Sequence, residues 1–239
     1  MTVVRASSLH ERIQSGVAAL QRDIVVPPGL FRGRDAGGCP RRGILSAREP
    51  TPHDPECERW MSLIADLDLF DVLQTRVALS DLESRLFAYV DMAVSTGGEN
   101  LLIMLRPHSL DIEAPTNGDV LDMTAAMYLA GIHAGLVIYY SGKKILSFFV
   151  NPDKKTYKEL LELIISGSRH LYKSELRGEL PEGTAGASCK SCPHKGNCDS
   201  AVTAHGGKRG SRKDAEGTGA SGDRPEEGEQ TGTSLSEES

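Results

Sequence analysis

The sequence lacks any run of about 18 apolar residues, so we expect no membrane-spanning helix. Its first residues also lack the basic and then apolar pattern of a secretory signal, which favours a cytoplasmic protein without membrane contact. Cysteine is scarce and odd in number, with five in 239 residues. An odd count without an export signal argues against a disulfide framework and favours metal ligation by thiolates.

Large apolar residues almost vanish after His205, where Leu235 is nearly the only one. Such a segment cannot offset the entropy of ordering, so we expect a folded domain over 1–204 and a disordered charged tail over 205–239. The tail supplies half of the net charge of −6. The rest of the chain is nearly balanced in charge. This balance argues against non-specific binding of nucleic acid over the whole surface but allows a local basic groove.

Three of the cysteines form the pattern C-x2-C-x5-C at Cys189, Cys192 and Cys198. Three thiols within ten residues are typical of a site for one metal ion or one iron–sulfur cluster. Both sites need four ligands, so a fourth must come from elsewhere in the chain. An iron–sulfur cluster is the preferred interpretation, and zinc on the same thiolates is the alternative, because spacing alone does not separate them.

Cys39 is the preferred fourth ligand, because its Gly-Gly-Cys-Pro setting exposes the thiol together with the backbone. The other candidates are Cys57, His194 and His205. Cys57 lies between two glutamates, whose charges disfavour a thiolate, and it is interpreted as a half-buried thiol.

Periodicity predicts an α/β fold. A capping box at Ser8 opens a predicted helix, and a second helix is expected over 58–73. Apolar runs over 84–94 and 101–106 on either side of a Gly-Gly turn predict two strands that form a hairpin. Runs over 136–140 and 145–150 predict another hairpin. A buried helix is expected over 122–135, and a long amphipathic helix follows a cap at Asn151 or Asp153.

These motifs resemble those of the RecB-like exonucleases that include the fourth CRISPR-associated protein, an iron–sulfur nuclease of spacer acquisition. Cys39-Pro-Arg-Arg is similar to that family's first cysteine motif, and C-x2-C-x5-C to its last. The resemblance implies a restriction-endonuclease-like mixed sheet flanked by helices. It also implies an iron–sulfur subdomain in which Cys39, Cys189, Cys192 and Cys198 hold a 4Fe-4S cluster.

The resemblance places Asp91 where the family has an aspartate that binds Mg²⁺ or Mn²⁺. Met104 and Arg106 then stand in the places of the family's glutamate and lysine, and Tyr128 keeps its tyrosine. Met104 cannot bind a hard cation, and Arg106 is a poor substitute for a lysine that positions water. Asp91, Arg106 and Tyr128 therefore form a degenerate catalytic set. A carboxylate nearby in sequence could fill the vacant place: Asp111, Glu113, Asp119 or Asp122.

Four arginines bracket the first cysteine and are the expected contacts to a DNA backbone: Arg32, Arg34, Arg41 and Arg42. The resulting hypothesis is an iron–sulfur protein that binds DNA, preferably single-stranded, in prokaryotic antiviral defence or DNA processing. Other CRISPR-associated or DNA-processing proteins are its expected partners. One alternative is an active metal-dependent exonuclease on single-stranded DNA, and another is an iron–sulfur redox sensor that does not bind DNA.

Overall fold

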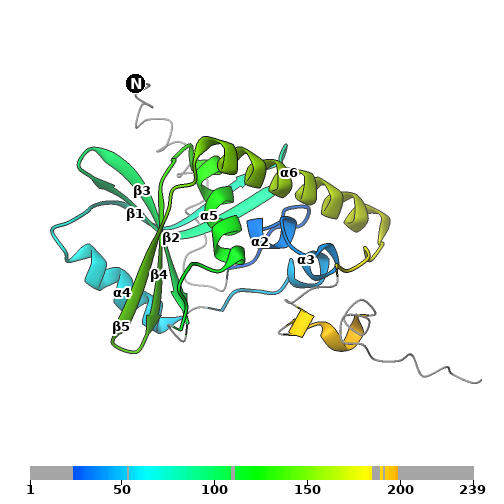
Figure 1. Cartoon of the computed structure of the whole chain (residues 1–239), viewed down its shortest axis with the longest axis horizontal. Helices are drawn as coiled ribbons and strands as arrows, with labels where there is room; N and C mark the ends of the chain where they lie inside the picture. Colours follow the sequence, from blue (N-terminus) through cyan, green and yellow to red (C-terminus); the bar gives the residue numbers. More distant parts are fainter. Residues whose placement is uncertain (1–23, 53, 109–110, 185–188, 191, 199–239) are drawn as a thin grey trace, which may run out of the picture. The chain divides into compact units, whose positions relative to one another are not determined.

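A five-stranded sheet forms the centre of the computed structural model, which describes residues 24–52, 54–108, 111–184, 189–190 and 192–198 (Figure 1). The strands are β1 (Asp71–Asp81), β2 (Leu86–Thr96), β3 (Glu99–Pro107), β4 (Gly135–Ser141) and β5 (Lys144–Val150). They lie in chain order across the sheet. The β3–β4 pair is parallel and the other three pairs are antiparallel, so the sheet is mixed.

Helices cover both faces of this sheet. On one face lie α2 (Gly33–Ala36), α3 (Pro40–Ser46), α5 (Asn117–Ala130) and α6 (Lys154–Arg177), and on the other lies α4 (Pro55–Ala65) (Figure 1). A short 3-10 helix, η3 (Lys195–Asn197), lies near the end of the described chain. No helix of the described residues is long and apolar enough to cross a membrane.

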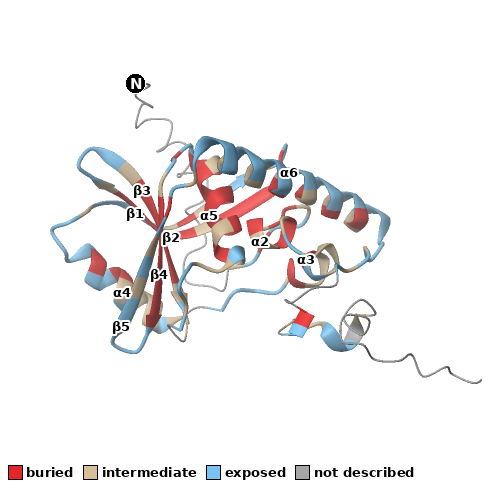
Figure 2. Cartoon of the chain, in the orientation of Figure 1, coloured by how far each residue is buried: buried red, intermediate tan, exposed pale blue. Residues whose placement is uncertain are grey.

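Two hydrophobic clusters account for this layering. The larger one joins the sheet to α5 and α6, and the smaller one packs Met61 and Ile64 of α4 against the opposite face. On α6 the buried residues recur every three or four positions at Ile164, Ser168, Leu171 and Ser174. This spacing gives the helix one buried and one exposed face, as Figure 2 shows.

Glycines allow α2 to approach its neighbours closely. A Cβ added to Gly33 would collide with the Leu121 carbonyl of α5, and one added to Gly167 would collide with the Ala36 carbonyl. Both helices can therefore pack backbone to backbone against α2. This packing fixes the segment that leads into Cys39.

The α/β class, the mixed sheet flanked by helices and both hairpins are confirmed, and the iron–sulfur subdomain stays a prediction. The long helix is also confirmed, with the Asp153 side chain accepting hydrogen bonds from the Lys155 and Thr156 amides. The helix predicted from Ser8 and the charged tail lie outside the described residues. All described residues belong to one compact unit.

Two predicted helices were misplaced. The helix expected over 58–73 begins at Pro55, where Asp54 caps it, and ends at Ala65, so that strand β1 follows it from Asp71. The helix expected over 122–135 begins at Asn117 because the Thr116 hydroxyl accepts a hydrogen bond from the Asp119 amide. It ends at Ala130 because Gly131 adopts a left-handed conformation, with φ of 69°.

Candidate functional site

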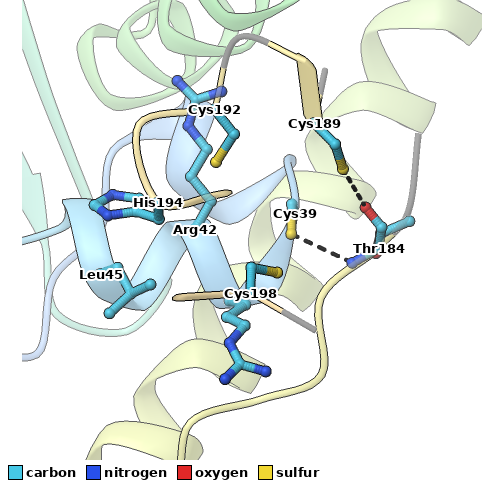
Figure 3. A pocket seen from close by; sticks show the side chains of 9 residues that line it. Cys39, Arg42, Leu45, Thr184, Cys189, Cys192, His194 and Cys198 are labelled. Atoms are coloured by element: carbon cyan, nitrogen blue, oxygen red, sulfur yellow. Dashed lines mark hydrogen bonds between the residues drawn. The ribbon is translucent and has the colours of Figure 1, made fainter. Parts of the chain in front are cut away.

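Four of the five cysteines line one pocket. Cys39 stands at the N-cap of α3, and Cys189, Cys192 and Cys198 come from the segment around η3 (Figure 3). The same pocket is lined by Arg41, Arg42, Leu45, Thr184 and His194. Cysteines from opposite ends of the described chain therefore meet in one place.

The backbone after α6 holds two of these thiols. The Thr184 amide donates to Cys39 Sγ at 3.3 Å, and the Cys189 thiol donates to the Thr184 carbonyl at 3.7 Å. A third contact joins the segments, since His194 Nε2 lies 2.8 Å from Ser46 Oγ at the end of α3. The three contacts position the last cysteines against α3.

Arg41 adds an unusual feature to this pocket. Its Nε atom is buried and has no hydrogen-bond partner among the described residues. A buried guanidinium N–H without an acceptor costs free energy, so the position favours an anionic or electron-rich partner. A cluster held by four thiolates carries net negative charge and sulfur acceptors, and the donor set and Arg41 both fit such a group.

The thiols are gathered but not arranged as a finished coordination shell. Among the described residues, no three histidine, cysteine, aspartate or glutamate side chains are placed to hold one metal ion together.

The fifth cysteine is separate from the pocket. Cys57 lies on α4, is half-buried, and donates its thiol to Asp91 Oδ1 at 3.5 Å. Burial raises the pKa of the Cys57 thiol, and the neighbouring Asp91 charge raises it further. The thiol therefore stays protonated and uncharged near neutral pH.

A second constellation, the ionic network, links β2, β3, α5 and α2. Arg106 on β3 lies between two carboxylates: its Nη1 is 3.5 Å from Asp91 Oδ2, and its Nε is 3.2 Å from Asp119 Oδ1. Arg34 on α2 extends the network, with Nη2 3.0 Å from Asp119 Oδ1 and Nε paired with Asp122. All three aspartates are buried.

The surroundings move the pKa values of the two bridged carboxylates in opposite directions. Burial raises the pKa of Asp91, although the Arg106 charge and the Leu105 amide oppose the shift. Burial also raises the pKa of Asp119, but the Thr116 hydrogen bond and the Arg34 charge, with smaller contributions from neighbouring groups, outweigh it. The pKa of Asp119 consequently lies below its usual value, and Asp119 is the firmly ionised member of the pair.

The chain matches no protein-family model. No curated protein matches it either. Its fold is similar to the crystal structure of SSO0001, with 11% identity, a TM-score of 0.45, and coverage of 81% of this chain and 95% of that one. It is also similar to an alkaline exonuclease, LHK-Exo, from Laribacter hongkongensis, with 11% identity, a TM-score of 0.46, and coverage of 72% and 94%. Likenesses of this degree carry no conclusion about the activity of this chain.

The predicted catalytic residues lie in two different environments. Asp91 and Arg106 meet in the ionic network, whereas Tyr128 is half-buried and packs against the main hydrophobic cluster. Met104 is fully buried in that cluster, and its thioether side chain has no oxygen to offer a cation. Of the four nearby carboxylates, Asp119 reaches Arg106, Asp122 reaches Arg34, and Asp111 and Glu113 are exposed.

The four predicted DNA contacts divide into two pairs. Arg32 is engaged internally, since its Nε lies 2.7 Å from Asp35 Oδ2 and its Nη2 donates to the Ser46 carbonyl. Arg34 belongs to the ionic network. Arg41 and Arg42 line the cysteine pocket, and Arg42 is exposed. Of the four, Arg42 is therefore the best placed to meet a ligand from solvent.

The sequence indicated Asp119 as a carboxylate for the vacant place or as a negative charge at a helix N-terminus, but not as the link between Arg34 and Arg106. The signal was present as Thr116-Asn-Gly-Asp119 before an apolar run, a pattern that marks a helix start. Recognising that start would have placed Asp119 and Asp122 on the first turns of α5, on one side of the helix.

Proposed function

We propose that this chain is an iron–sulfur protein that binds DNA and does not itself hydrolyse it. One observation carries the cluster assignment: four cysteines from two distant segments line a single pocket together with Arg41, whose buried Nε has no partner among the described residues. Four thiolates match a cubane cluster, and Arg41 and Arg42 would lie beside its negative charge. When bound, the cluster supplies a covalent joint between the segments and a redox-active centre.

The cluster assignment is tested on protein purified anaerobically. We expect about four irons and four sulfides per chain, with the broad visible absorption of an iron–sulfur cluster. Cys39→Ser should lose most of the iron. Cys57→Ser is the matched control and should retain it, because Cys57 lies on α4 away from the pocket. Stoichiometric zinc without sulfide would contradict the assignment.

DNA binding rests on the resemblance of the cysteine motifs and on the cations beside the pocket. Arg42 is exposed there, so it can approach a phosphate while the cluster stays partly covered. We expect single-stranded DNA to bind in a salt-sensitive manner and Arg42→Ala to weaken this binding. Lys143→Ala is the control, because Lys143 is an exposed cation of the β4–β5 turn and does not line the cysteine pocket.

The experiment is a titration of fluorescent single-stranded DNA at several salt concentrations. Removing one phosphate contact should lower the salt dependence by about one unit of slope, uniformly across DNA sequences. If cluster-loaded protein does not bind DNA even at low salt, the redox-sensor alternative replaces this part of the proposal.

A non-hydrolytic role is the third part of the proposal. It is supported by the burial of Met104 in the core and by the internal engagement of Asp91 and Arg106. The chain would then act as a DNA-holding scaffold beside other CRISPR-associated or DNA-processing proteins in antiviral defence. Incubation of cluster-loaded protein with single-stranded DNA and Mn²⁺ should leave the DNA intact. Degradation that disappears in Asp91→Ala would instead establish the exonuclease alternative.

A further inference from the structure

We propose that Arg106 takes the place of a divalent cation in this protein and is the permanent counter-ion of Asp91 and Asp119. Its guanidinium donates to both carboxylates, at 3.5 Å and 3.2 Å, and its side chain is 21% exposed. The two aspartates are 3% and 5% exposed. The positive charge that a nuclease draws from Mg²⁺ or Mn²⁺ is here part of the polypeptide.

The carboxylate oxygens are already supplied with donors. Asp91 Oδ2 accepts from the Leu105 amide at 2.7 Å as well as from Arg106, and Oδ1 accepts from the Cys57 thiol. Asp119 Oδ2 accepts from the Thr116 hydroxyl at 2.6 Å and the Tyr139 hydroxyl at 2.7 Å, while Oδ1 faces the two guanidiniums. A metal ion would have to displace several of these donors at once.

Charge leads to the same conclusion. Mg²⁺ and Mn²⁺ bind through oxygen ligands, and their binding sites carry an excess of negative charge. Here Arg106 and Arg34 both face Asp119, so an added divalent ion would meet two fixed positive charges. Met104, in the place of the family's glutamate, contributes neither charge nor oxygen. The residues present therefore do not fit the divalent ion that the nuclease resemblance implies.

The same geometry predicts what happens when Arg106 is replaced. Asp91 and Asp119 both contact one guanidinium, so removing that guanidinium leaves two carboxylates facing one vacated position. Without Arg106, Asp91 has no counter-ion and Asp119 keeps only Arg34, so the two buried carboxylates are strained by repulsion and desolvation, and a hard cation relieves both. We therefore expect a latent cation site that appears only when Arg106 is replaced by a neutral side chain. This inference holds whether or not the cysteines carry a cluster.

The test measures Mn²⁺ binding by calorimetry and by electron paramagnetic resonance on full-length protein. Arg106→Met removes the charge and keeps an unbranched apolar stem, and Arg106→Lys keeps a charge. Wild type and Arg106→Lys should show no binding that depends on Asp91. Arg106→Met should bind Mn²⁺ at least tenfold more tightly and should melt at a higher temperature with Mn²⁺ than without.

The double variant Asp91→Asn with Arg106→Met is the matched control and should lose the gained binding. Circular dichroism verifies that each variant is folded. Two results would overturn the inference: Mn²⁺ binding by wild type that is lost in Asp91→Asn, or a folded Arg106→Met protein with no gain in binding. The wild-type arm needs no folded Arg106 variant, so the inference remains testable if Arg106→Met does not fold.

Discussion

Arg34 donates to Asp119 at 3.0 Å and thereby joins the helix just before Cys39 to the helix that packs on the sheet. Asp119 also accepts from Arg106, so one carboxylate holds two arginines from different parts of the chain. The segment that carries the first cysteine is consequently anchored to the sheet by charge as well as by close helix packing.

Replacing Asp119 should be destabilising. Asp119→Ala removes the acceptor shared by Arg34 and Arg106, which keep Asp122 and Asp91 as partners, so the cost should fall below the about 3–5 kcal/mol typical of an uncompensated buried charge. Denaturant unfolding measures the loss. Asp111→Ala is the control, because Asp111 is exposed and its removal should change stability by less than about 0.5 kcal/mol. Equal stabilities for the two variants would refute the structural role of Asp119.

Gly167 should not tolerate a side chain. A methyl group at this position of α6 would collide with the Ala36 carbonyl oxygen, and crowding of this kind costs about 1–3 kcal/mol. Thermal and denaturant unfolding of Gly167→Ala should show that loss. Gly118→Ala is the matched control within a helix, because the nearest atom lies 3.6 Å from the added Cβ. That variant should be as stable as wild type or slightly more stable, since alanine favours helix.

Titration of Tyr139 should lower the free energy of unfolding at alkaline pH. Burial, followed by the hydrogen bond to Asp119, raises the pKa of Tyr139 to about 12, against about 10 in the unfolded chain. A raised pKa means that the folded state retains its proton longer. The associated stability is complete below about pH 10 and is lost as the pH rises towards 12, by at most about 1.4 kcal/mol per pH unit.

Tyr139→Phe is the comparison that isolates this titration. It should be less stable at neutral pH by about 1 kcal/mol, because the Asp119 and Thr116 hydrogen bonds are lost. Its unfolding free energy should then fall less steeply than that of wild type between pH 10 and 12. Parallel pH profiles would show that the Tyr139 pKa does not change on folding.

Cys57 should react slowly with alkylating reagents. Burial and the Asp91 charge raise its pKa, so little thiolate is present at pH 8. Peptide mapping by mass spectrometry after iodoacetamide treatment should show labelling more than about tenfold slower in native than in unfolded protein. Asp91→Asn should accelerate the native reaction. Native labelling as fast as in denaturant would contradict the buried, protonated state.

The hairpins and the long helix could be predicted because their information is local. Nearly continuous apolar runs on either side of the Gly-Gly turn define β2 and β3, and the cap at Asp153 with its spaced leucines defines α6. Strand β1 could not be read in this way. Its first residues are largely exposed, and its buried residues, such as Val77 and Leu79, acquire their environment only through pairing with β2.

The candidate site shows the same division. The cysteine motif is local in sequence and specific in chemistry, which is why Cys39 and the last three cysteines could be named together. The ionic network is not local, since 85 residues separate Arg34 from Asp119. Nothing in the spacing of charges indicates which arginine meets which carboxylate, so only the folded arrangement identifies Arg106 as the bridge between Asp91 and Asp119.

The separation along the chain between the two parts of the cysteine pocket also determines when the pocket can form during biosynthesis. Cys39 and Thr184, which touch in the folded protein, are separated by 145 residues. At roughly 5–20 residues per second, a ribosome needs about 7–29 s to synthesise the stretch between them. During that interval the nascent chain carries Cys39 without the three other cysteines of the pocket. Any inorganic group bound by all four cysteines must therefore be inserted after nearly the whole domain has left the ribosome.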